Sequence, residues 1–251
     1  RLTRAQLFAA AMILYPMWYD PYRDRLCELE DVLATLEAQT RAWREDRKGW
    51  VAEGMRLWKR KPLQGFFGRE TPVVFAADPQ AARAQAKDGR RRMVWANRAK
   101  DDEAVRVEDG FLRSRGLGAS LVPPLSLVAD DLGIYYDPTR PSRLERLIAE
   151  SHALRPDETL RASRLIARLV GGGLTKYNLA GAVPALPEGH RILVPGQVED
   201  DASILLGSPR MQSNAALLVR VRADNPGAVV LWKPHPDVEA GLRPGKVEDP
   251  H

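Results

Sequence analysis

The spacing of apolar residues changes along the chain, and its first part has the spacing of helices. One long stretch carries apolar side chains every three or four positions with charged residues between them, which is typical of an amphipathic helix. An earlier apolar run ends at Pro16, where a helix must end or kink. We expect residues 1–68 to form a helical segment that packs against a neighbouring domain, with Trp43, Trp50 and Trp58 on one face.

From residue 69 onward, short apolar runs alternate with amphipathic stretches. The runs with the length and composition of buried strands are PVVFAA, RMVWAN, VRVED, HRILVPG and AVVLWKPHP. Helical stretches separate most of them, and strands that alternate with helices indicate right-handed βαβ units and a mostly parallel sheet. The sequence therefore predicts an α/β, Rossmann-like region over residues 69–251, preceded by the helical segment.

Composition narrows the class of protein. The chain has 251 residues, of which 44% are hydrophobic, so it is long enough to bury a core and is not a disordered segment. Cys27 is the single cysteine, which excludes an internal disulfide and any multi-cysteine metal site and fits a reducing compartment. No run reaches the roughly 18 apolar residues that span a bilayer, and no signal peptide is visible. We therefore expect a cytoplasmic protein.

The net charge of +5 comes mainly from arginines spread along the chain. Such a balance is compatible with nucleic acid, an anionic membrane surface or an anionic small substrate, and the charge alone does not choose among them. The sequence has no zinc-finger, RRM or basic-zipper pattern. We expect no nucleic-acid partner.

Polar motifs follow three of the predicted strands. EDGFLRSRGLG, GQVEDDAS and KPHPD each begin where a strand ends. In an open parallel sheet, ligands bind outside the carboxyl ends of the strands, where loops and helix N-termini present unpaired N–H groups. We expect the three loops to converge on one cleft, so that the acidic pair Glu108–Asp109 faces the acidic triplet of residues 199–201.

Several residues in these loops suit an anionic ligand. Lys233 supplies a positive charge, and His235 is a donor held in a stiff loop between two prolines, so the pair suits a phosphate. In the glycine-rich loop, Arg113 and Arg115 add guanidinium donors, while Gly116 allows the backbone to approach a ligand closely or to adopt a positive φ. Salt-bridging to neighbouring carboxylates is an equally good interpretation of the two arginines.

Three stretches together resemble a known family. RVEDGFLRSRGLGASLVPPLSLVADDLGIYYD, VPGQVEDDASI and WKPHPDVEAG are similar to the KpsC-type capsule polysaccharide biosynthesis proteins, which are β-Kdo glycosyltransferases. The resemblance is specific over about residues 105–240, and LYPMWYDP and CELEDV resemble the segment that joins the two halves of those proteins. It implies a GT-B-like module whose nucleotide-binding half is incomplete in this chain.

The resemblance also implies a function. Members of the family are cytoplasmic enzymes, peripheral to the inner membrane, that transfer β-Kdo from CMP-Kdo to a lipid-linked Kdo acceptor built on lysophosphatidylglycerol. They work beside the capsule assembly and export proteins, and their second module is associated with the 2→7 linkage and the first with 2→4. Related β-Kdo transferases retain the anomeric configuration through a covalent intermediate on an aspartate. No cofactor or metal is expected, because the CMP donor leaves with a single phosphate and the sequence has no clear DxD loop.

The family pattern assigns roles to individual residues. Retention by double displacement needs a carboxylate nucleophile on one face of the anomeric carbon and an acid/base group on the other. The frame Gln-x-x-x-Asp-x-Ser singles out Asp201 as the nucleophile, and Glu108 is the matching acid/base group. Glu199 and Asp200 are expected to hold backbone amides or to cap the next helix. The substrate and nucleotide contacts implied are Lys233 and His235 on the phosphate, Arg113 and Arg115 on the Kdo carboxylate, and Gln197, Ser203, Asp109 and Gly116.

Other functions remain open at this point. A non-catalytic, nucleotide-binding scaffold of capsule assembly would keep the sheet without needing both Glu108 and Asp201. An inverting CMP-sugar transferase would need one base and no nucleophile. A basic adaptor for a lipid surface would depend on the helical segment, which is as acidic as it is basic.

Overall fold

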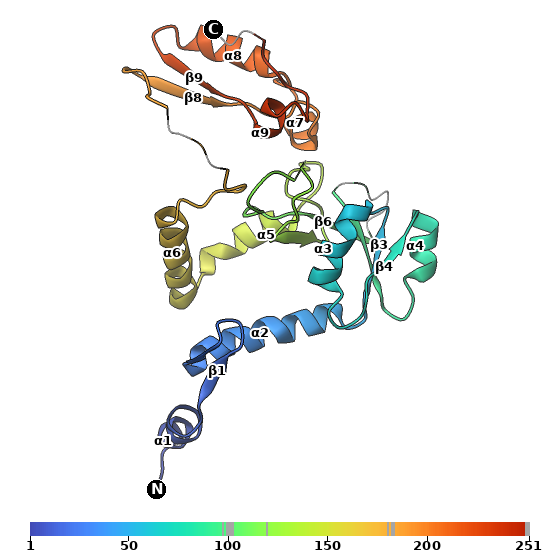
Figure 1. Ribbon diagram of the computed structural model, residues 1–251, viewed down its shortest axis with the longest axis vertical. Coiled ribbons are helices and arrows are strands. Elements are labelled where there is room, and N and C mark those ends of the chain that lie inside the picture. Colours follow the sequence, from blue (N-terminus) through green and yellow to red (C-terminus); the bar gives the residue numbers. More distant parts are fainter. Residues whose placement is uncertain (97, 99–102, 119, 180, 182–183, 249–251) are drawn as a thin grey trace.

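The computed structural model describes residues 1–96, 98, 103–118, 120–179, 181 and 184–248. An N-terminal arm extends away from the rest of the molecule (Figure 1). Its elements are a short helix α1 (Arg4–Phe8), a π-helical turn η1 (Ala9–Leu14), the antiparallel pair β1 (Trp18–Asp20) and β2 (Arg25–Cys27), and the long helix α2 (Leu29–Asp46). The helical spacing seen in the sequence is confirmed for α2.

A five-stranded sheet follows the arm, in the order β4-β3-β5-β6-β7. Its strands are β3 (Trp50–Glu53), β4 (Val74–Ala76), β5 (Arg91–Trp95), β6 (Ala104–Asp109) and β7 (Leu127–Asp130). Neighbouring strands are parallel except β7, which pairs antiparallel with β6. Helices α3 (Leu57–Phe67) and α4 (Pro79–Gln85) connect β3 to β4 and β4 to β5.

The core of this sheet lies on both of its faces. Along β3, Trp50 and Ala52 point into a cluster with Leu63 of α3, while Val51 points into a second cluster with Ala82 of α4. Because successive side chains of a strand alternate between faces, a strand covered on both sides is apolar throughout. The two helices therefore cover opposite faces of the sheet.

The expectation that residues 1–68 are helical is wrong for β3. Trp50 is only 2% exposed, and its indole donates a hydrogen bond of 2.6 Å to Oδ1 of Asp46. Trp43, Trp50 and Trp58 do not share a helical face, since they belong to α2, β3 and α3. A buried strand of four residues has no period that separates it from a helix. The signal that could have found it is the pair of glycines around it, Gly49 and Gly54, which adopt φ of 82° and 60°.

A second sheet contains the parallel pair β8 (Arg191–Pro195) and β9 (Val229–Lys233). Helices α7 (Ala202–Gly207) and α8 (Asn214–Asp224) lie between these strands in the chain, and α9 (Pro236–Glu239) follows them. The α/β class with mostly parallel strands is confirmed. The predicted strands, however, lie in two separate sheets rather than one.

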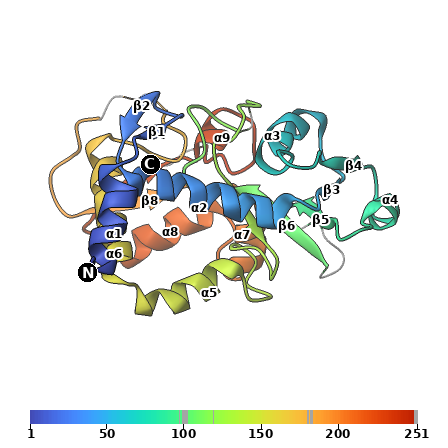
Figure 2. The same ribbon diagram turned by 90° about the horizontal axis from the view of Figure 1, so that it is seen from below.

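Helices α5 (Arg143–Glu150) and α6 (Pro156–Gly171), joined by the turn η2 (Ser151–Ala153), lead from the first sheet to the second. Figures 1 and 2 both place α6 at an edge of the molecule. None of the helices assigned within the described ranges has an apolar stretch that would reach across a bilayer. How the chain divides into domains between residues 1–68 and 69–251 stays a prediction, although β3 joins the sheet from the N-terminal side of that boundary.

Candidate active site

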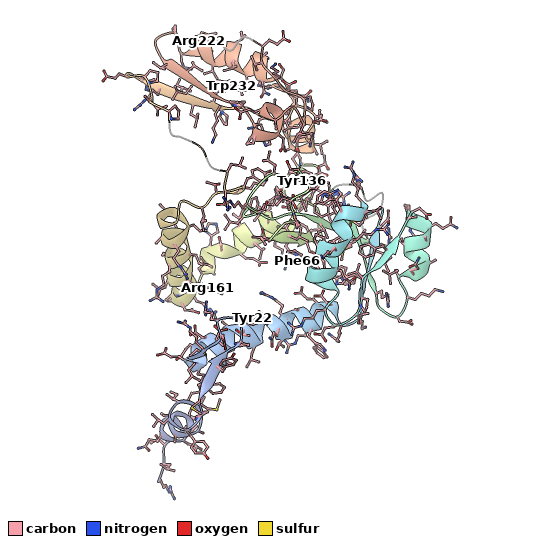
Figure 3. The ribbon with its side chains drawn as sticks, viewed as in Figure 1. Tyr22, Phe66, Tyr136, Arg161, Arg222 and Trp232 are labelled. Atoms are coloured by element: carbon pink, nitrogen blue, oxygen red, sulfur yellow. The ribbon has the colours of Figure 1, made fainter. Side chains whose placement is uncertain are left out.

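The molecule has two halves around this site: the first contains the five-stranded sheet β3–β7, and the second contains β8, β9 and helices α7–α9. A cleft of about 690 Å³ is lined by residues from both halves. Its lining contains residues of both acidic clusters singled out in the sequence: Glu108 and Asp109 from β6, and Asp200 and Asp201 from the loop after β8. Figure 3 shows Tyr136, which also lines the cleft, where the loops of the first half approach the second. The structure thus brings the strand-end carboxylates together although 90 residues separate them in sequence, as parallel strand ends allow.

Glu108 lies at the end of β6 and is largely buried in the cleft wall. Burial raises the pKa of its carboxyl group above the usual value, and the neighbouring charge of Asp109 raises it further. The backbone N–H of Asp109 donates to Oε1 of Glu108 at 2.9 Å, and the positive charges of Lys59 and Lys176 also lower this pKa. A carboxyl group with a raised pKa in a cleft has the properties of a proton-transfer group.

Asp109 and Arg113 form a partly buried ion pair beside Glu108. Nε of Arg113 donates to Oδ2 of Asp109 at 2.5 Å, and Nη1 donates to Oγ of Ser114 at 2.8 Å. The Arg113 side chain is 1% exposed, and its Nη2 is buried with no hydrogen-bond partner among the described residues. Arg113 therefore lines the cleft with Nε and Nη1 engaged and Nη2 unpaired among the described residues. The alternative interpretation, salt-bridging to a neighbouring carboxylate, holds for its pair with Asp109.

Arg115 and Gly116 do not line the cleft. The side chain of Arg115 is exposed, and nothing in its position supports the predicted contact with a sugar carboxylate. Gly116 adopts φ of 110° and donates its N–H to the carbonyl of Tyr177 at 2.7 Å. It therefore fixes the glycine-rich loop against Tyr177, which does line the cleft.

Asp201 lines the cleft and also caps a helix. It is the N-cap of α7, and its Oδ1 accepts hydrogen bonds from the backbone N–H of Ser203 at 2.9 Å and from its hydroxyl at 2.7 Å. The cap is thus Asp201 itself, and the expectation that Asp200 caps the helix is wrong. Asp200 instead pairs with Arg243 at 2.7 Å.

The residues around Asp201 hold the loop in place. Glu199 accepts the backbone N–H of Asn214 at 2.7 Å, which confirms that it holds a backbone amide. The backbone N–H of Gln197 donates to Oδ1 of Asn214 at 2.9 Å, and the side chains of Gln197 and Ser203 line the cleft. These contacts lock the loop after β8 between α7 and α8, which orients Asp201.

His235 lines the cleft, whereas Lys233 does not. Nδ1 of His235 accepts the backbone N–H of Asp237 at 3.1 Å, which leaves Nε2 to carry the proton of the neutral ring. Burial lowers the pKa of His235, so the ring is neutral near pH 7. Lys233 ends β9 with an exposed side chain, so of the two residues predicted to contact a phosphate only His235 lies in the cleft wall.

Several residues that line the cleft were not among the site residues predicted from the sequence. They are Lys59, Trp95, Tyr135, Tyr136, Lys176 and Tyr177. Lys59 was overlooked because β3 was taken for helix, although α3 begins just beyond a strand end, which is where ligand-binding residues gather. Across the described residues there is no group of three His, Cys, Asp or Glu side chains placed to hold a metal ion.

Two α/β halves that share a polar cleft at the ends of their strands define a two-lobed α/β protein with a ligand site between the lobes. The chain belongs to the capsule polysaccharide biosynthesis protein family, whose model matches residues 84–164 and 164–249.

Curated relatives carry names from the same field. The capsule polysaccharide modification protein LipA of Neisseria meningitidis serogroup A is 38% identical over 258 residues, which cover 96% of this chain and 36% of LipA. The lipopolysaccharide-processing protein LpsZ of Rhizobium meliloti is 49% identical over 144 residues, covering 55% of this chain and 32% of LpsZ. The chain thus spans about a third of the length of these relatives.

Two solved structures from Thermosulfurimonas dismutans share the fold. The KpsC beta Kdo 2,7 transferase matches with a TM-score of 0.60 and 34% identity, over 76% of this chain and 61% of that one. The KpsC beta Kdo 2,4 transferase matches with a TM-score of 0.64 and 30% identity, over 78% and 63%. The resemblance seen in the sequence is confirmed, and the similarity to both structures does not separate the two linkages.

Proposed function

We propose that this chain is part of a retaining β-Kdo transferase that uses CMP-Kdo to extend a lipid-linked Kdo acceptor. The observation that carries the proposal is that Glu108 and Asp201, which come from the two different sheets, line one cleft. The names of the two structural neighbours support the sugar, because both are described as beta Kdo transferases. The lysophosphatidylglycerol anchor, the inner-membrane site and the capsule export partners belong to the same proposal.

The first step assigns Asp201 as the nucleophile. Its carboxylate attacks the anomeric carbon, and the bond from that carbon to the phosphate oxygen breaks with its electron pair leaving on CMP. Hydrogen bonds from Ser203 fix the orientation of Asp201 through Oδ1, which leaves Oδ2 for attack. His235 donates from Nε2 to the phosphate, where negative charge accumulates as CMP leaves.

The second step assigns Glu108 as the base. A hydroxyl of the acceptor attacks the anomeric carbon of the glycosyl-enzyme, and Glu108 takes its proton while the bond to Asp201 breaks. Each step inverts the configuration, so the product keeps that of the donor. The reaction uses protein groups alone and needs no cofactor.

A product analysis tests the proposal. We expect the full-length protein, given CMP-Kdo and an acceptor that ends in Kdo, to release CMP and add a Kdo residue whose anomeric configuration, read by NMR, is β like that of the donor. An α-linked product would identify an inverting transferase. CMP binding without any product from the folded protein would favour the non-catalytic scaffold.

His235→Ala is expected to weaken CMP binding by about 1.5–3 kcal/mol, the usual contribution of a hydrogen bond to a charged group. Isothermal titration calorimetry with CMP measures the change. Lys233→Ala is the matched control, because Lys233 lies two residues earlier with its side chain outside the cleft, and we expect its affinity to stay within error. Equal losses in both variants, or none in His235→Ala, would contradict the role given to His235.

A further inference from the structure

Lys59 is held in the cleft wall by two indole rings. Its Nζ lies 2.9 Å from the ring centroid of Trp95 and 5.1 Å from that of Trp58. Trp95 ends β5, the strand that pairs with β6, where Glu108 lies. Lys59, Trp95 and Glu108 all line the cleft, and aromatic rings attract a cation at such distances. The rings therefore hold the ammonium group beside the strand end that carries Glu108.

The charges around this pair come from several elements. Those that act on Lys59 are Glu108, Asp109, Arg98 and Arg56, and those that act on Glu108 are Asp109, Lys59 and Lys176. Tyr135 also faces Glu108 and stays protonated, because burial and the nearby carboxylates raise its pKa. Of the two lysines, Lys59 has the larger effect on Glu108. Arg113 is paired with Asp109.

We propose that Lys59 is a positioning residue for the second step: its positive charge keeps Glu108 ionised, so that Glu108 can take the proton of the acceptor hydroxyl. The inference rests on the proposed function. Burial favours the protonated form of Glu108, and a protonated carboxyl group cannot act as a base. An ammonium ion in the same wall stabilises the carboxylate without touching the sugar, while the indoles keep it from turning towards solvent.

The effect of Lys59 must depend on pH. Burial lowers the pKa of Lys59 to about 7, so it carries its charge below pH 7 and loses it above. Below pH 7 the ammonium ion opposes protonation of Glu108, and the acidic limb of the rate profile lies at lower pH than it would without Lys59. Above pH 8 Lys59 is neutral in the wild type as well, so removing it should make little difference there.

Rate profiles of three variants test this role. At pH 6, Lys59→Met should transfer Kdo roughly tenfold more slowly than wild type, which corresponds to a displacement of about one pH unit. At pH 9 the two rates should agree, and the KM for CMP-Kdo should be unchanged. Lys59→Arg should keep the wild-type profile because it restores the positive charge. Lys61→Met, on the same helix and outside the cleft, is the control for loss of a lysine from α3.

A second measurement does not depend on transfer. The carboxyl carbon of Glu108, labelled with ¹³C and assigned by its loss in Glu108→Gln, can be titrated by NMR, and its midpoint should rise in Lys59→Met. An unchanged midpoint overturns the inference whatever the transfer assay shows. A raised KM at all pH values with an unmoved profile would make Lys59 a substrate contact and also overturn it. If the midpoint rises in Lys59→Met but the wild-type protein transfers no Kdo, the effect of Lys59 on Glu108 is retained and the proposed function is rejected.

Discussion

Asp201→Asn is expected to abolish Kdo transfer, with the rate falling by roughly 10⁴-fold or more, the scale seen when a catalytic nucleophile is removed. The amide cannot attack the anomeric carbon, yet asparagine is as good an N-cap as aspartate. Helix α7, which begins after Asp201, should therefore keep its cap from the side-chain oxygen to the N–H of Ser203. Initial rates of Kdo incorporation into a Kdo-terminated acceptor measure the loss.

The neighbouring carboxylate supplies the control for this prediction. Asp200 is adjacent in sequence and lines the same cleft, but it is half exposed and paired with Arg243. We expect Asp200→Asn to keep most of the wild-type rate, because an exposed ion pair contributes little. A rate lost in Asp200→Asn and retained in Asp201→Asn would move the nucleophile to Asp200 and contradict the assignment.

Glu108→Gln is expected to accumulate a covalent Kdo adduct on Asp201. The first step needs no base, because the carboxylate attacks directly and CMP leaves as an anion, so the variant should still form the glycosyl-enzyme. The second step needs a group to take the acceptor proton, and glutamine cannot. Intact-mass spectrometry after incubation with CMP-Kdo should therefore show one added Kdo residue in the variant, which persists when acceptor is added.

Fragmentation of the modified peptide must place the adduct, since Glu199, Asp200 and Asp201 are consecutive. Glu108→Gln combined with Asp201→Asn is the matched control and should carry no adduct. Normal turnover by Glu108→Gln would show that another group takes the proton. A Glu108→Gln variant that is inactive, folded and free of adduct, although it still binds CMP, would argue against double displacement.

The main features of the fold and of the cleft could be predicted from the sequence. Alternation of short apolar runs with amphipathic stretches is enough to predict a mostly parallel α/β structure, because buried parallel strands need helices to cover them. The same rule places Glu108, Asp201 and His235 at or after strand ends, and although these strands lie in two sheets, the strand ends of both sheets border one cleft. Residues far apart in sequence were thus expected in one cleft before any distance was known, and the cleft contains all three.

Only the tertiary structure determines which groups surround each side chain. The sequence places Lys233 and His235 equally close to the strand end, but only the packing of β9 and α9 turns His235 into the cleft and Lys233 to the surface. Burial and partners likewise fix the pKa of Glu108 and the ion pair of Arg113. These properties depend on which groups surround a charge in space. Lys59 therefore became a candidate only when β3 placed the start of α3 beside the end of β6, because desolvation and Coulomb forces depend on distance in space and not on position in the sequence.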